Sequence, residues 1–93
     1  MEQLDFEWDD EKAASNLAKH GVSFDEALPA FLDVSRLERH DGREDYGEDR
    51  FLTIGLADGF VLTITYTLRD DIIRIISARK ATLHEQRDYW KNR

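Results

Sequence analysis

The stretch Ile72-Ile73-Arg74-Ile75-Ile76-Ser77-Ala78-Arg79-Lys80-Ala81 decides the fold, and it leads directly into Thr82-Leu83-His84-Glu85. Four isoleucines in five positions predict a strand that is buried on both faces. Thr82 and Glu85 then form a capping box, so a helix begins where the strand ends. The two-residue period of a strand predicts two faces, one with Ile73, Ile75, Ser77 and Arg79 and the other with Ile72, Arg74, Ile76, Ala78 and Lys80.

The composition predicts one small soluble domain over residues 1–93. A chain of 93 residues with 41% hydrophobic content has room for a single core. The absence of cysteine excludes disulfides and thiolate metal sites, and it favours a reducing compartment. The acidic N-terminus has no signal-peptide pattern, and the longest apolar run is too short to cross a bilayer. We therefore expect a cytoplasmic protein.

The net charge of −7 is unevenly distributed along the chain. Residues 69–93 contain seven Lys or Arg against four acidic residues, whereas residues 1–68 contain six against sixteen. A basic C-terminal segment on an acidic body suits an anionic substrate on one side and a cationic partner on the other. A solvated acidic surface with scattered arginines is an equally good interpretation of composition alone.

The first half of the chain predicts short elements. Residues 4–8 alternate as a short strand, Asp9 caps a helix that ends at Gly21, and Ser23 with Glu26 caps a second helix. Pro29 lies inside the apolar pattern of the second helix and should kink or shorten it. Residues 35–40 predict an edge strand, and residues 41–49 a charged loop.

The second half predicts a sheet. Residues 50–57 and 60–67 are strands joined by Asp58-Gly59, a dipeptide that favours a tight hairpin. Arg69-Asp70-Asp71 forms the next turn, into the Ile72 strand. The fold class is therefore α+β: a short N-terminal strand and two helices, an antiparallel meander of three to four strands, and a C-terminal helix.

No nucleotide-binding, metalloprotease or serine-hydrolase motif is present. The three histidines lie in separate segments without ligand spacing, so we predict neither a metal site nor a cofactor. His20 is best explained by contact with the last carbonyls of its helix. His40 ends a strand beside the acidic loop, where it is either a general base or a solvated edge residue.

The cations at the Ile72 strand are the main candidates for chemistry. Arg74 lies among isoleucines, so it either pairs with a carboxylate or points into a concave site. Arg79 and Lys80 either meet an anion or extend over the core surface. Tyr66 and Tyr89 can add hydroxyls to the same concavity. Tyr89 or Trp90 can instead anchor the last helix, and for Trp90 we favour the anchor.

These groups are sufficient for RNA cleavage without a metal. The 2′-hydroxyl must lose a proton, the pentavalent phosphorane needs cations, and the 5′-oxygen must gain a proton. We expect Arg79 and Arg74 to hold the phosphate and Lys80 to stabilise charge or assist proton transfer. The remaining candidates are Tyr89, which would stack on a base, and His40 or Glu48, either of which would be the general base.

The chain also resembles a known family, the BrnT toxins, over residues 5–90. The residues that carry the resemblance are Phe6-Glu7-Trp8-Asp9, Lys12, Asn16, Lys19-His20-Gly21-Val22-Ser23-Phe24, Gly47-Glu48-Asp49-Arg50, Tyr66-Thr67 and Ile75-Ile76-Ser77-Ala78-Arg79-Lys80-Ala81. The resemblance implies a RelE-like ribonuclease fold and the toxin half of a type II toxin–antitoxin pair. It implies cleavage of RNA, often mRNA, and a BrnA-type antitoxin that binds DNA, so that the toxin meets operator DNA only through its partner.

Two alternatives to an active toxin stay open on the sequence. One is a non-catalytic module that binds a basic protein through the acidic body. The other is a degenerate toxin that keeps the fold and the antitoxin contact without activity.

Overall fold

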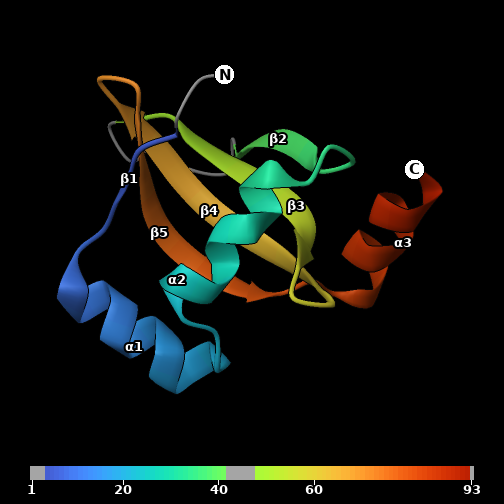
Figure 1. Ribbon diagram of the computed structural model, residues 1–93, viewed down its shortest axis with the longest axis horizontal. Coiled ribbons are helices and arrows are strands. Elements are labelled where there is room, and N and C mark those ends of the chain that lie inside the picture. The colour runs from blue at the N-terminus through green and yellow to red at the C-terminus, as the bar shows by residue number, and fades with distance from the viewer. Residues whose placement is uncertain (1–3, 42–47, 93) are drawn as a thin grey trace.

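The computed structural model describes residues 4–41 and 48–92, and it confirms the α+β class. A short strand comes first, two helices and a 3₁₀ turn follow, and four further strands lead to one helix that ends the described chain (Figure 1). In order the elements are β1 (Phe6–Glu7), α1 (Asp10–His20), α2 (Phe24–Ala27), η1 (Leu28–Leu32), β2 (Leu37–Asp41), β3 (Arg50–Ala57), β4 (Phe60–Arg69), β5 (Ile72–Lys80) and α3 (Leu83–Lys91).

The sheet has five strands in the order β1-β5-β4-β3-β2. The meander from β2 to β5 is antiparallel, as predicted, and β1 adds a short parallel strand beside β5. Both hairpin turns use residues with positive φ, which matches the right-handed twist of the strands. Asp58 and Gly59 have φ of 50° and 85°, and Asp70 and Asp71 have φ of 50° and 71°.

Element ends differ from the sequence prediction where local chemistry intervenes. The first strand is only Phe6–Glu7, because just these residues pair with β5. Pro29 shortens α2 as predicted, and the chain continues as the 3₁₀ turn η1. Asp41 belongs to β2 rather than to the charged loop, and residues 42–47 of that predicted loop lie outside the described residues.

A β-bulge in β5 corrects the predicted faces of the central strand. The pairing of β4 with β5 shifts between Thr65 and Tyr66, so that Thr65 faces Ser77 while Tyr66 faces Ile75. Ile76 is therefore an extra residue, and the two-residue period restarts after it. Ile73, Ile75 and Ala78 share the main core, whereas Ser77 and Arg79 lie on the other face. The prediction that Ile75 and Arg79 share a face was wrong for this reason.

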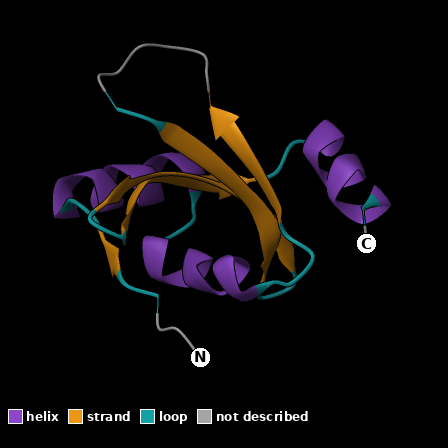
Figure 2. Cartoon of the chain, turned by 90° about the horizontal axis from the view of Figure 1, so that it is seen from above, coloured by secondary structure: helices purple, strands orange, loops and turns teal. Residues whose placement is uncertain are grey.

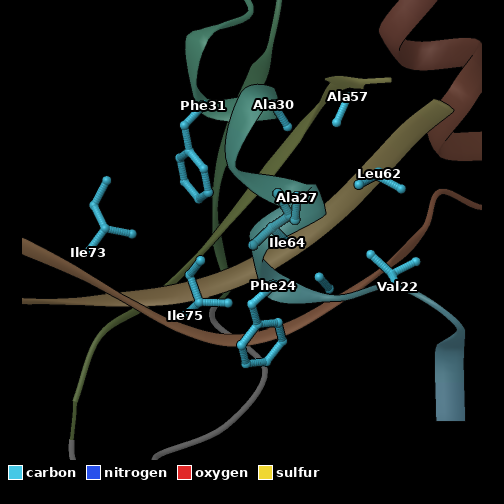
Figure 3. Packing of buried hydrophobic residues seen from close by; sticks show 11 residues of the cluster. Val22, Phe24, Ala27, Ala30, Phe31, Ala57, Leu62, Ile64, Ile73 and Ile75 are labelled. Carbon is cyan, nitrogen blue, oxygen red and sulfur yellow. The ribbon is translucent and has the colours of Figure 1, made fainter. Parts of the chain in front are cut away.

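The main core lies between one face of the sheet and α1, α2 and η1 (Figure 3). Phe24, Ala27 and Phe31 project from α2 and η1 toward Ile64 and Ile75 on the strands. The buried members of this cluster are Val22, Phe24, Ala27, Ala30, Phe31, Ala57, Leu62, Ile64, Ile73, Ile75 and Ala78. We call this side of the sheet the covered face.

One polar residue, Asn16, and one small residue, Gly55, fix this packing. Asn16 is 7% exposed, and its side-chain amide donates to the carbonyls of Val22 (2.9 Å) and Ala78 (2.8 Å). Its Oδ1 also accepts from the Ala78 amide, which joins α1 to β5 beyond the bulge. Gly55 allows η1 to approach β3, because a Cβ there would lie 2.7 Å from the carbonyl oxygen of Ala30.

The last helix packs on the opposite side and forms a second, smaller core. Figure 2 shows α3 apart from the other helices, and its Tyr89 packs with Ile54, Val61 and Ala81. The Tyr89 hydroxyl donates to the Asp33 carboxylate, which also accepts from the Leu56 amide. Trp90 is 50% exposed and Tyr89 is 0% exposed. The residue that anchors α3 is therefore Tyr89, and the preference for Trp90 was wrong.

No helix in residues 4–41 and 48–92 is long and apolar enough to cross a membrane.

Candidate functional site

The other side of the sheet, which α3 covers only in part and which we call the open face, carries a polar hollow beside α3. Four of its lining residues are register partners in one row across the sheet: Arg39 on β2, Leu52 on β3, Thr65 on β4 and Ser77 on β5. The others are His40, Asp41, Arg79 and Glu85, and the volume of this open hollow is about 460 Å³. We call this site the open-face hollow.

Arg79 is held in this hollow by a carboxylate from α3. Its Nη1 donates to Glu85 Oε1 at 2.7 Å and its Nη2 to Glu85 Oε2 at 3.0 Å. Oε1 also accepts from the Thr82 amide (2.8 Å) and the Thr63 hydroxyl (2.9 Å). The hydrogen bonds from Arg79 are the main cause that lowers the Glu85 pKa to about 2, against the opposing effect of burial. The pair therefore stays ionised, and the guanidinium has a fixed orientation.

A second arginine is held in a similar way at the other side of the hollow. Arg39 Nη2 donates to Asp88 Oδ2 at 2.9 Å, and this hydrogen bond lowers the Asp88 pKa. His84 Nε2 lies 3.5 Å from the same carboxylate oxygen. Both arginines of the hollow are thus tied to α3, which makes the position of that helix decisive for the site.

His40 borders the hollow, but its ring lies on the covered side of β2. Strand alternation directs its side chain away from those of Arg39 and Asp41. The ring packs edge-on against Phe51, with centroids 5.4 Å apart, and Nε2 lies 3.3 Å from Asp49 Oδ1. The side chain is 57% exposed, so a ligand at this rim of the sheet can reach it.

The other candidates from the sequence lie outside the hollow. Lys80 is on the covered face, with its Nζ 4.6 Å from the centroid of the Phe60 ring. Arg74 Nη1 pairs with Glu7 Oε2 at 2.8 Å, which is the carboxylate pairing left open above. Glu48 lies near Arg50 and Arg69, at 3.8 and 3.7 Å. The structure therefore does not gather these charges around Arg79.

Neither tyrosine faces the hollow. Tyr89 projects from α3 into the second core and is fully buried. Its ring therefore cannot stack on a base, contrary to the prediction from the sequence. Tyr66 packs edge-on against Phe31 of the main core, and its hydroxyl donates to Glu38 at 2.6 Å. Burial, followed by the Glu38 contact, raises the Tyr66 pKa to about 12. Both hydroxyls are committed to carboxylates of the fold.

Arg39 and Glu85 were missed as site residues for identifiable reasons. Arg39 is a charged residue on an edge strand, and only the register with Ser77 three strands away reveals its place. Glu85 was recognised as a capping residue, but its spacing of six residues from Arg79 carries no signal, because the chain turns between them. In the described residues, no three His, Asp or Glu side chains group closely enough to hold a metal ion.

The chemistry available at this hollow is recognition of a phosphate. Guanidinium groups match phosphate oxygens with paired N–H donors, and Arg39 and Arg79 line the same cavity. The hydroxyls of Thr65 and Ser77 add hydrogen-bonding groups to its floor. A phosphodiester bound here would meet two guanidinium groups that Asp88 and Glu85 already orient, and oriented donors of this kind can stabilise a pentavalent phosphorus.

Comparison with known proteins agrees with this chemistry. Residues 8–85 match the family model described as the ribonuclease toxin BrnT of type II toxin–antitoxin systems. No curated protein matches the chain. The matched segment runs from the start of α1 through all of β5 to Glu85, and it therefore contains every residue that lines the open-face hollow. The chain belongs to the BrnT family of ribonuclease toxins of type II toxin–antitoxin systems.

Proposed function

We propose that this protein is an endoribonuclease that cuts RNA without a metal ion and holds the scissile phosphate in the open-face hollow. The observation that carries the proposal is the convergence of Arg39 and Arg79 on one cavity, each held by a carboxylate of α3. Preorganised cations stabilise a developing negative charge without reorganising at the moment of reaction. Two guanidinium groups thus supply the charge stabilisation that a metal supplies in other nucleases.

In the proposed reaction the ribose 2′-oxygen attacks the neighbouring phosphorus. A bond forms between O2′ and phosphorus, and the bond from phosphorus to O5′ breaks. His40, oriented by Asp49 at 3.3 Å, accepts the proton of the 2′-hydroxyl at the rim of the hollow. The 5′-oxygen takes a proton from solvent, so the products are a 2′,3′-cyclic phosphate and a 5′-hydroxyl.

Glu85 and Asp88 are positioning residues in this account. The pKa of Glu85 lies near 2, so its carboxylate is a weak base at neutral pH. All four hydrogen bonds that it accepts serve the arrangement of Arg79 and the start of α3. His40 is the proton acceptor in this account because its side chain is exposed at the rim of the hollow and Asp49 orients its ring.

The partner that we propose is a BrnA-type antitoxin in the same cytoplasm. Membership in a type II toxin family implies a protein that neutralises the ribonuclease. Because the chain carries 20 acidic residues against 13 basic ones, a basic antitoxin segment suits its surface. Operator DNA is then reached through the antitoxin.

The test is cleavage of a single-stranded RNA by the purified chain in the presence of EDTA, with analysis of the product ends. We expect cleavage that EDTA does not abolish and products with 2′,3′-cyclic phosphates. Cleavage that depends on added Mg²⁺, or products with 5′-phosphates, would contradict the mechanism. Intact RNA with a folded protein that still binds an antitoxin would favour the degenerate toxin, and intact RNA with a folded protein that binds no antitoxin would favour the non-catalytic module.

A further inference from the structure

A second polar groove lies between α1 and β5, and we call it the α1 groove. It is lined by Lys12, Ser15, Asn16, Lys19 and His20 of the helix and by Ile76 and Ser77 of the strand. Its volume is about 220 Å³. The mechanism proposed above uses none of the helix residues.

The groove is built by the fold rather than by flexible surface side chains alone. Lys12, Ser15, Asn16 and Lys19 follow the helical spacing of i, i+3, i+4 and i+7, which places them in one stripe along α1. The buried amide of Asn16 fixes that stripe against β5 through Ala78. On the strand side, the bulge at Ile76 shapes the wall and places Ser77 at the border.

The charge of the groove is opposite to that of the whole protein. The net charge of the chain is −7, yet none of the described residues that line this groove is Asp or Glu. Asp10 and Glu11 of the first helical turn do not line it. Lys12 and Lys19 are exposed, and neither forms an ion pair with any acidic residue in residues 4–41 and 48–92. By contrast, the arginines of the open-face hollow are already paired.

The two sites share one lining residue. Ser77 lines both the α1 groove and the open-face hollow, where it is followed two residues later by Arg79. We take Ser77 as the point at which a chain bound in the hollow would pass into the groove. Lys12 and Lys19 are separated by roughly 10 Å along the helix axis, at a rise of about 1.5 Å per residue. This length can accommodate more than one phosphate of an extended strand.

We propose that the α1 groove is a subsite that binds the backbone phosphates of single-stranded RNA flanking the scissile bond. The inference rests on the proposed function, because it extends the path of the same substrate. Lys12 and Lys19 contact phosphates, and Ser15 and Ser77 donate hydrogen bonds to them. No Phe, Tyr or Trp side chain lines the groove in the described part of the chain, and the lysines outnumber its one imidazole, so the groove binds the backbone rather than the bases.

The experiment measures binding of a fluorescent single-stranded 16-nucleotide RNA by anisotropy at several salt concentrations. It compares the native chain, a Lys12→Ala/Lys19→Ala variant and a matched Arg87→Ala/Lys91→Ala variant that removes the same charge from α3. Each phosphate contact contributes about 0.7 to the slope of log K against log salt for single strands. We expect the slope of the α1 variant to fall by about 1.4 and its affinity to fall at least fivefold at low salt, with the α3 variant unchanged.

Cleavage assays on the same proteins separate the two proposals. We expect the α1 variant to show a raised KM for the 16-nucleotide RNA, an unchanged kcat, and unchanged cleavage of the dinucleotide UpU, which is too short to enter the groove. A native chain that cuts RNA while the α1 variant keeps the full salt slope would overturn the groove alone. Equal loss of slope in both variants would also overturn it. A slope that depends on the lysines in a chain that cuts no RNA would support the groove and overturn the proposed function.

Discussion

The two faces of the sheet differ in what covers them and in what their residues do. The covered face packs isoleucines and alanines against α1, α2 and η1, and eleven buried residues form its core. The open face carries arginines, hydroxyls and carboxylates beside α3 and leaves a hollow of about 460 Å³. The comparison shows a division of labour in which one face supplies stability and the other presents charge.

The boundary between these roles runs through single elements. In β5 the bulge at Ile76 directs Ile75 into the core and Arg79 into the hollow. In α3, Tyr89 packs the helix against the sheet, whereas Glu85 and Asp88 form ion pairs with the two arginines of the hollow.

The contrast between Tyr89 and Trp90 is the first to test. We expect Tyr89→Ala to lower the free energy of unfolding by about 3–5 kcal/mol, because a fully buried aromatic ring is removed. Trp90→Ala should cost about 0.5–1.5 kcal/mol, the value of its edge-on contact with Tyr89. Urea unfolding followed by circular dichroism measures both. Equal losses would show that Trp90 shares the anchor.

The contrast between Ile75 and Ile76 tests the bulge. Ile75 is 1% exposed, so Ile75→Ala should cost about 2–5 kcal/mol. Ile76 is half-buried at the wall of the α1 groove, so Ile76→Ala should cost clearly less. The same urea titration compares them. A larger loss for Ile76→Ala would mean that the two-residue period continues through β5 without interruption.

The ion pair of Glu85 on the open face makes the stability of the protein depend on pH in the acid range. Its folded-state pKa is about 2, below the ordinary 4.5. The stabilisation from this group is therefore present above pH 4.5 and is lost as the pH falls toward 2. We expect the difference in unfolding midpoint between the native chain and Glu85→Gln to close across this window. A difference that stays constant from pH 7 to pH 2.5 would exclude the pairing with Arg79 as its source.

Tyr66 on the covered face makes the stability depend on pH in the alkaline range, with the opposite sign. We expect this effect on stability to be the smallest of the four. Its pKa is raised from 10 to about 12, so the folded state favours the neutral phenol. The stability from this group is present below pH 10 and is lost between pH 10 and pH 12. Absorbance at the tyrosinate band, compared with Tyr66→Phe, should show a late-titrating phenol in the folded protein. A phenol that titrates near pH 10 would contradict its burial.

The sequence predicted the elements better than their faces. Caps at Asp9, Ser23 and Thr82 act within four residues, so the helix starts could be located from local chemistry. The bulge at Ile76 could not, because it depends on how β4 pairs with β5 across the sheet. One extra residue there moved Arg79 to the face opposite Ile75.

The same limit applied to the candidate site. Arg79 was identified from its place at the end of the central strand, and it lies in the hollow. Arg39 and Glu85 required the register of four strands and the turn before α3, which no local pattern encodes. The residue type of Tyr89 suits stacking on a base. Its position in α3, however, places the side chain in the second core.

The most direct test of the central claim uses two cations that are adjacent in the chain. Arg79 lies in the open-face hollow, and Lys80 lies on the covered face beside Phe60. We would measure RNA cleavage by Arg79→Ala and Lys80→Ala, with folding of each variant checked by circular dichroism. Removing one preorganised donor to a transition-state charge typically lowers the rate by about 10²–10³. We predict a loss of this size for Arg79→Ala and near-native cleavage for Lys80→Ala. Equal losses, or a greater loss for Lys80→Ala, would contradict the assignment of the active site to the open face.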